Sequence, residues 1–482
     1  MMKLASMRAA VLAAGLALAA PAHAQHWKLA AETAALRVAI QKNDCDAILP
    51  AARLMIADPD FDLDPEWVRV SVYSLAAQCA ARTSQHEEAL EDARRATDLG
   101  DDSVGWTVRI EEAAFLNRPD ELAKSVRRLG QLDRRALDAI PDQIFYRLIN
   151  KAHDPASREQ AASVLAALEV ANYTPSAPFA RPDGLWLTYA QIEADTGNRE
   201  HADKLLRRVG DVYSLMGAAL DGRFSGEVAA DPARFDVRAA QERQLTADQA
   251  AMTAHPELLE AVVMTISDLR ALERYDEALA LAQRTLDRLA AGPTPFTDLA
   301  GELSDLNEAK ADVLLDLGRD SDAVAAERQA TRFGRHGQAN VSQVINLAGF
   351  LTETGDPEAA LADLKVFDGA DAPNASPYGV AWVHSERACA DQQLNRTADA
   401  AAEMAYLSAH ARDNPNAQLK ALLCQNDLDD AAAEMKTLLQ DPGQRVLALT
   451  YLVQWDLPPH FTPLGAVLHA RFESVAARPD VQ

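Results

Sequence analysis

Apolar residues recur at helical intervals on both sides of a short polar turn between residues 344 and 367. Intervals of three and four residues place side chains on one face of an α-helix. The first apolar stripe contains Val344, Leu347, Ala348 and Leu351, and the second contains Ala360, Leu364 and Phe367. This stretch therefore predicts two amphipathic helices in succession, each with one face that needs covering.

The turn between these helices reads Thr-Gly-Asp-Pro. Gly355 can take the left-handed conformation that ends a helix. Asp356 can cap the following helix with its side chain, and Pro357 suits the first helical position. The turn residues therefore support the same helix–turn–helix unit that the apolar pattern predicts.

This unit resembles the tetratricopeptide (TPR) repeat, a helix–turn–helix of about 34 residues. Residues 183–209 match the same pattern through Trp186, Tyr189, Ala190, Gly197, Ala202 and Leu206. The resemblance implies an all-α fold, an α-solenoid of about ten TPR-like helix–turn–helix units. It also implies that a ligand would lie against the first helices of successive hairpins.

The repeated pattern divides the chain into two arrays. It runs through residues 25–209, fails between 210 and 257, and resumes over 258–440. We expect 210–257 to form an irregular helical joint and 441–482 to form a C-terminal helical cap. The motif Gly-Ala-x-Leu-x-x-Arg-Phe occurs at both 217–224 and 465–472, which favours two arrays with similar ends, although an alanine-rich chain can also produce it by chance.

Large aromatic residues recur early in successive predicted first helices of the first array. Trp67, Trp106, Tyr146 and Trp186 follow one another at intervals of 39, 40 and 40 residues. One interpretation is that each ring wedges between neighbouring hairpins. The alternative is a row of exposed rings that stacks against a glycan.

The N-terminal segment has the pattern of a secretory signal peptide. Lys3 and Arg8 provide a basic start, residues 9–20 are apolar, and Ala22-His23-Ala24 is a small-x-small cleavage site. We expect residues 1–24 to be removed after Ala24. The apolar run is shorter than the roughly 20 residues that a membrane span needs, and no later apolar stretch reaches that length. The alanine- and arginine-rich composition is typical of a bacterial protein. The predicted location is therefore the periplasm or the outside of the cell.

The four cysteines fall into two pairs with a spacing of about one repeat. Cys45 and Cys79 are 34 residues apart, and Cys389 and Cys424 are 35 apart. An even number of cysteines in an exported protein favours disulfides, and one-repeat spacing places each pair on adjacent helical units. We expect Cys45–Cys79 and Cys389–Cys424 bonds, the alternative being four buried thiols.

The formal net charge of −25 limits the classes of partner. Such a surface repels nucleic acid and anionic lipid, and it favours cationic partners or serves solubility alone. Four carboxylates at intervals of three and four residues share one predicted helical face: Asp305, Glu308, Asp312 and Asp316. Their mutual repulsion would be relieved by a basic peptide segment, so we predict a partner-binding strip; the alternative is a solvated acidic face.

Catalytic and metal-binding signatures are few. The sequence contains no HExxH, GxSxG or P-loop motif, and its mature histidines are scattered singly. Asp60, Asp62 and Asp64 alternate as in a calcium loop, but Pro65 stands where that loop needs glycine. An acidic connection between helices accounts for them better. We therefore predict no enzyme, no cofactor and no metal site.

Three functional hypotheses follow. The first is a non-catalytic periplasmic scaffold that binds an envelope protein through a helical-repeat groove. The second is a glycan-binding module, for polysaccharide or peptidoglycan, which requires the periodic aromatic rings to be exposed together. The third is an enzyme whose site is assembled from dispersed residues. The sequence favours the first and predicts neither a particular partner nor an oligomeric state.

Overall fold

The computed structural model describes residues 38–149, 155–292, 296–334, 340–369, 375–453 and 457–482. Every regular element in these ranges is a helix, which confirms the predicted all-α class. The expected signal peptide, residues 1–24, lies outside the described residues. The chain divides into two compact units, residues 1–209 and 210–482, and each is described by itself.

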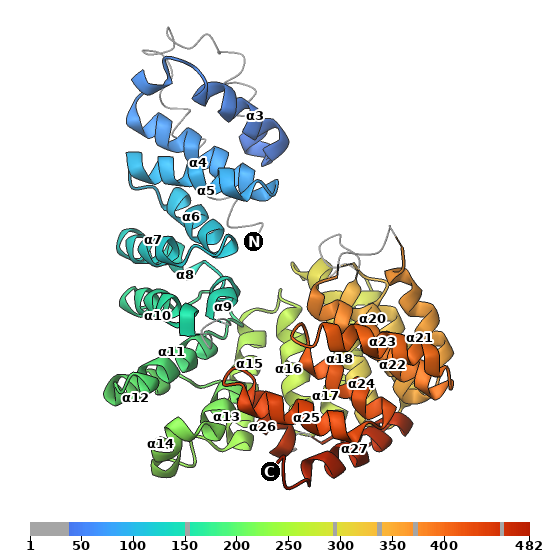
Figure 1. Cartoon of the computed structure of the whole chain (residues 1–482). Helices are drawn as coiled ribbons and strands as arrows, with labels where there is room; N and C mark the ends of the chain where they lie inside the picture. The colour runs from blue at the N-terminus through green and yellow to red at the C-terminus, as the bar shows by residue number, and fades with distance from the viewer. Residues whose placement is uncertain (1–37, 150–154, 293–295, 335–339, 370–374, 454–456) are drawn as a thin grey trace. The chain divides into compact units, whose positions relative to one another are not determined.

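The first unit is built from consecutive helix pairs (Figure 1). Helices α4 and α5, α6 and α7, and α11 and α12 pack as hairpins, and α7 also packs against α10. Its helices are α3 (Cys45–Ile56), α4 (Glu66–Arg82), α5 (His86–Leu99), α6 (Ser103–Phe115), α7 (Pro119–Leu132), α8 (Arg134–Asp138), α9 (Gln143–Ile149), α10 (Pro155–Val170), α11 (Asp183–Asp195) and α12 (Arg199–Leu206).

The second unit begins with α13 (Val212–Leu220), α14 (Ser225–Ala230) and α15 (Val237–Ala254). Hairpins then follow in order: α16 (Glu260–Ala271) with α17 (Tyr275–Ala290), α18 (Leu299–Asp316) with α19 (Asp320–Ala330), α20 (Val341–Thr354) with α21 (Pro357–Leu364), α22 (Pro377–Gln393) with α23 (Thr397–Ala409), and α24 (Pro415–Gln425) with α25 (Leu428–Gln440). The unit ends with α26 (Arg445–Val453) and α27 (Pro463–Ala476).

The α20–α21 turn has the conformation that its residues predict. Gly355 caps α20 with a φ of 97°, in the left-handed region that a side chain rarely adopts. The Asp356 side chain accepts a hydrogen bond from the Ala359 amide at 3.2 Å, and Pro357 is the first helical residue. Residues with positive φ occupy other hairpin turns as well, among them Asn117, Gly197, Glu273, Gly318, Asn395 and Asn426.

Alanine forms much of the contact between helices. Ala76, Ala77 and Ala80 on α4 and Ala89 and Ala93 on α5 are fully buried in one cluster. A methyl side chain lets two helix backbones approach closely, so little free volume remains between the helices. Helix α6 of the next hairpin packs against both α4 and α5, so successive hairpins cover one another's apolar faces, as the repeat resemblance implies.

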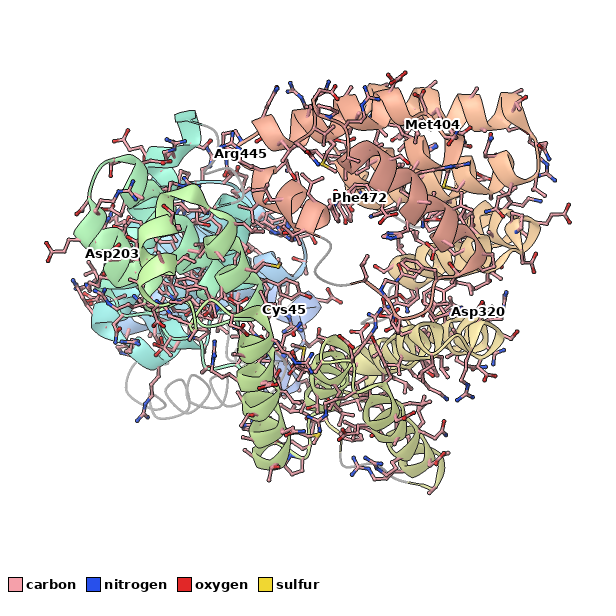
Figure 2. The ribbon with its side chains drawn as sticks, turned by 90° about the horizontal axis from the view of Figure 1, so that it is seen from below. Cys45, Asp203, Asp320, Met404, Arg445 and Phe472 are labelled. Carbon is pink, nitrogen blue, oxygen red and sulfur yellow. A yellow bond between two sulfur atoms is a disulfide. The ribbon has the colours of Figure 1, made fainter. Side chains whose placement is uncertain are left out.

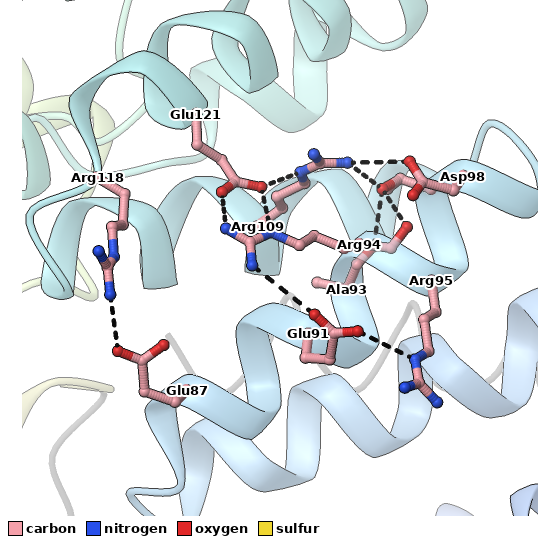
Figure 3. A network of polar contacts seen from close by, with 10 residues as sticks. Glu87, Glu91, Ala93, Arg94, Arg95, Asp98, Arg109, Arg118 and Glu121 are labelled. Carbon is pink, nitrogen blue, oxygen red and sulfur yellow. Dashed lines mark hydrogen bonds and ion pairs between the residues drawn. The ribbon is translucent and has the colours of Figure 1, made fainter.

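A network of charged side chains joins three helices of the first unit (Figure 3). The guanidinium of Arg109, whose side chain is 7% exposed, donates to Glu121 at 2.8 Å and to Thr97 at 2.7 Å. Arg94 also donates to Glu121 at 2.8 Å. Burial favours the neutral acid, but the two guanidinium groups outweigh it and hold the pKa of Glu121 below its usual value. Two cations thus share one carboxylate between α5, α6 and α7.

Each unit contains one disulfide, in the pairing that one-repeat spacing predicts. Cys45 on α3 bonds to Cys79 on α4, with Cα atoms 5.0 Å apart; Cys45 is labelled in Figure 2. Cys389 on α22 bonds to Cys424 on α24, with Cα atoms 5.2 Å apart. The second bond therefore joins the first helices of two successive hairpins.

Each disulfide should stabilise only the unit that contains it. Replacing Cys389 and Cys424 together by Ser should lower the free energy of unfolding of the second unit by about 2–4 kcal/mol, because the unfolded chain loses a constraint. The matched control replaces Cys45 and Cys79, which should affect the first unit instead. Denaturant unfolding followed by hydrogen exchange in each unit measures this, and equal destabilisation of both units by either double variant would contradict it.

Candidate functional site

The first helices of the second unit's hairpins share a surface with the C-terminal segment. Helix α16 contacts α18, α20 contacts α22, and α22 contacts α24. Helix α27 lies across this series, since it contacts α20 and α24 as well as α25. The segment expected to cap the end of the array therefore also lies over the first helices, and two cavities form beside it.

The first cavity, here called the acidic cavity, has a volume of about 380 Å³. Helices α16 and α18 and the segment 458–465 form most of its wall. Its charged lining residues are Arg270, Asp312, Asp316 and Glu353, and its ring-bearing residues are Tyr213, Tyr275, His460 and Phe461. Carboxylates outnumber cationic side chains here.

Arg270 holds the two aspartates of α18 in this cavity. Its Nε donates to Asp316 Oδ2 at 2.5 Å, and its Nη1 donates to Asp312 Oδ2 at 3.0 Å. The Asp316 side chain is 7% exposed, whereas that of Asp312 is one-third exposed. Burial and the neighbouring Asp316 raise the pKa of Asp312 despite the guanidinium. One cation thus binds two carboxylates in this cavity.

Lys420 on α24 is the centre of a second group with the same balance. Its Nζ donates to Glu353 Oε1 at 2.8 Å and to Glu386 Oε1 at 3.0 Å, which joins α20, α22 and α24. The Glu386 side chain is 4% exposed, and burial raises its pKa. Burial of the Lys420 ammonium disfavours its charge, but the two carboxylates outweigh this effect and raise its pKa. These three residues are called the Lys420 group below.

The second cavity, here called the aromatic cavity, has a volume of about 520 Å³. It lies between α22, α24, α26 and α27, and Lys420 is one of its lining residues. Its other walls are largely apolar and include Trp382, Leu419, Leu423, Tyr451 and Phe472; Phe472 is labelled in Figure 2. A concave site of this size with an apolar wall and a few polar groups is typical of ligand binding.

The four carboxylates of the predicted strip lie on α18, but other side chains of the chain contact them. Asp312 and Asp316 bind Arg270. Glu308 accepts hydrogen bonds from Gln343 at 2.8 Å and Asn346 at 2.6 Å, and Gln343 also lies 3.5 Å from Asp305. Side chains of the protein itself therefore reduce part of the mutual repulsion of these carboxylates, which the sequence prediction assigned to a partner. A partner-binding role for these residues remains a proposal.

Sequence reasoning missed Glu327 on α19. This side chain is fully buried, and among the described residues no group hydrogen-bonds to either of its carboxylate oxygens. Burial, with the carboxylates of Glu308, Asp312 and Asp305 nearby, raises the pKa of Glu327 to about 8 from its ordinary 4.5. The folded protein therefore binds a proton here that the unfolded chain releases at neutral pH.

Glu327 should make the second unit less stable as the pH rises. Because its pKa is higher in the folded state, its stabilising contribution is complete below about pH 4.5 and is lost as the pH rises toward 8. Glu327→Gln, which mimics the neutral acid, should be more stable than wild type at pH 8 by roughly a few kcal/mol and similar at pH 4.5. Urea unfolding across this range tests it, with the exposed Glu358→Gln as control; parallel pH profiles for wild type and Glu327→Gln would refute it.

The Lys420 group was also missed, although the sequence holds a signal for it. Glu386 and Lys420 are 34 residues apart, on the same two helices as Cys389 and Cys424. The one-repeat spacing that pairs the cysteines also pairs these opposite charges. Arg270 has no such signal, because its partners Asp312 and Asp316 lie 42 and 46 residues away.

The periodic aromatic residues of the first unit do not form an exposed row. Trp106 and Trp186 are buried, at 5% and 3% exposure, and only Trp67, at 44%, is exposed. Arginines cover the buried rings: Arg109 lies 4.9 Å from the Trp106 ring and Arg208 lies 3.5 Å from that of Trp186. These two tryptophans are therefore packing residues, as the first interpretation predicts. The row of exposed rings that a glycan-binding module requires is not found among the described residues of this unit.

The acidic connection at 58–64 folds as a short turn. Residues Phe61–Leu63 form a 3₁₀ turn whose Phe61 is buried, and Asp58 accepts a hydrogen bond from the Asp60 amide at 2.9 Å. Among the residues that the structure describes, no group of three or more His, Cys, Asp or Glu side chains is arranged to hold a metal ion. In the same ranges no helix is both long and apolar enough to cross a bilayer.

Comparison with known proteins matches no family model and no curated protein. Similar solved structures include that of Naa15/Naa10 bound to HypK-THB (15% identity, TM-score 0.24, 88% of this chain and 70% of that one). Another is the pentatricopeptide repeat protein PPR10 in complex with an 18-nt psaJ RNA element (14% identity, TM-score 0.29, 98% of this chain and 74% of that one). A third is the APC/C hetero-tetramer Cut9-Hcn1 (12% identity, TM-score 0.22, 95% of this chain and 94% of that one).

The class of the protein follows from its own coordinates. Its helices pair into successive hairpins, the turns carry left-handed residues, and neighbouring hairpins cover one another's apolar faces. The protein is a TPR-like α-solenoid. The first-helix surface of its second unit, with the acidic and aromatic cavities, is the candidate functional site.

Proposed function

We propose that this protein is an exported, non-catalytic scaffold that binds an envelope protein through the first-helix surface of its second unit. The observation that carries this proposal is the pair of cavities on that surface, because the acidic cavity is lined by three carboxylates and one arginine. Repeat hairpins stacked side by side commonly offer such extended surfaces to partners. A basic segment of the partner complements the charge of this one.

Export to the periplasm is supported by two features. The N-terminal 24 residues have the signal-peptide pattern, and all four cysteines are paired in disulfides, which persist in oxidising compartments. We expect the mature chain to begin at Gln25. Mass spectrometry of the N-terminal peptide from the periplasmic fraction measures this, and a protein that retains Met1 in the cytoplasmic fraction would contradict export.

Photo-crosslinking in intact cells tests the proposed surface. A photoreactive residue at Tyr213, which is 70% exposed and lines both cavities, or at Leu457, which is 47% exposed, should capture a discrete partner. The matched control position is Val366, 49% exposed and outside both cavities. Mass spectrometry identifies the captured protein; equal labelling from all three positions, or none, would rule out this surface.

The charge of the surface should determine how much partner is captured. Asp312→Asn with Glu353→Gln removes two carboxylates beside the cavities and should reduce capture severalfold, since exposed and half-buried ion pairs contribute modest free energies. The control, Glu358→Gln with Asp399→Asn, removes two exposed carboxylates from the second helices α21 and α23. Quantitative pull-down measures the ratio, and equal capture by both double variants would show that charge at the cavities is unimportant.

A further inference from the structure

One titratable side chain of the acidic cavity comes from the C-terminal segment rather than from a repeat hairpin. His460 lies in the stretch 457–462, directly before α27, and it lines the cavity together with residues of α16 and α18. Its side chain is 42% exposed, so the imidazole is open to solvent as well as to the cavity. A change in the charge of this ring therefore acts directly on whatever the cavity binds.

The imidazole of His460 lies on the turn between α18 and α19. Its Nε2 is 3.5 Å from Asp320 Oδ1, an oxygen that is buried and, among the described residues, receives no hydrogen bond. The ring is also so close to Gly318 that a β-carbon there would lie 3.1 Å from it. When His460 is protonated, it therefore forms an ion pair with Asp320 that holds the ring at the cavity.

The charged groups that face His460 across the cavity come from three helices. Asp312 and Asp316 on α18 and Glu353 on α20 are the carboxylates, and Arg270 on α16 is the cation; the other titratable lining residues are Tyr213 and Tyr275. Histidine is the side chain whose charge ordinarily changes between pH 5 and 8. Protonation of His460 gives the lining two cations against three carboxylates, so the cavity then attracts a further cation less strongly.

We propose that His460 is the protein's own cationic competitor at the acidic cavity and makes partner binding depend on pH. Protonated His460 supplies from within the charge that a basic side chain of the partner would bring, so the partner binds weakly. Neutral His460 leaves the carboxylates to the partner, which binds more tightly as the pH rises. This inference rests on the proposed function, because it names the regulation of the same site.

Titration with a basic peptide at two pH values tests this without the natural partner. The probe is acetyl-Gly-Arg-Gly-Arg-Gly-amide, whose charge is the same at both values, and calorimetry measures its affinity. The mature wild-type protein should bind it about fivefold more tightly at pH 7.5 than at pH 5.5, since one half-exposed charge contributes a modest free energy. His460→Gln, which stays neutral, should bind tightly at both, and His460→Arg, which stays cationic, should bind weakly at both.

The comparison between proteins separates His460 from the other groups that titrate. Asp312 and Glu327 change charge in wild type and variants alike, so only the difference between their pH profiles reports on His460. The matched control is His469→Gln on α27, because His469 lines the aromatic cavity and not the acidic one; it should keep the wild-type profile.

Two results would overturn this inference. One is the same ratio of affinities between the two pH values in wild type and His460→Gln, which would show that another group sets the pH dependence. The other is a peptide that binds the wild-type protein at neither pH. In either case photo-crosslinking from Tyr213 decides the proposed function separately, since a captured partner would leave that function in place.

Discussion

Packing of each hairpin against its neighbours is the contact on which the rest of this protein depends. Ala76 and Ala80 on α4 are fully buried in a cluster that contains residues of α3, α5 and α6 as well. A hairpin alone would expose this surface to water and lose its main source of stability. Both cavities are lined by residues from several helices, so neither belongs to a single hairpin.

Charged groups in this protein differ in how many carboxylates face each cation. In the first unit, Arg94 and Arg109 share one carboxylate, that of Glu121, and its pKa falls. In the second unit, Arg270 and Lys420 each face two carboxylates, and the pKa values of Asp312 and Glu386 rise. Three carboxylates of these two groups, those of Asp312, Asp316 and Glu353, line the acidic cavity, which is why we propose a cationic partner there.

Local patterns predicted what depends on local chemistry, and they failed where distant segments meet. Gly355 and Asp356 have the turn roles that their positions indicate, and repeat spacing paired Cys389 with Cys424. The same spacing cannot reveal that Arg270 reaches Asp312 and Asp316, because these residues lie 42 and 46 positions away, which is more than one repeat. Nor can it reveal that the C-terminal helix α27 lies against α20 and α24, since this contact bridges several hairpins.

The Cys389–Cys424 bond gives the aromatic cavity a dependence on redox history. The bond joins α22 to α24, the helices that carry Trp382 and Asn416, so it links two helices of the cavity wall covalently. A newly made chain in a reducing compartment has only side-chain packing to hold these helices together. In such a chain the walls of the cavity would be held less firmly until an oxidant closes the bond, so the shape of the cavity would depend on the compartment.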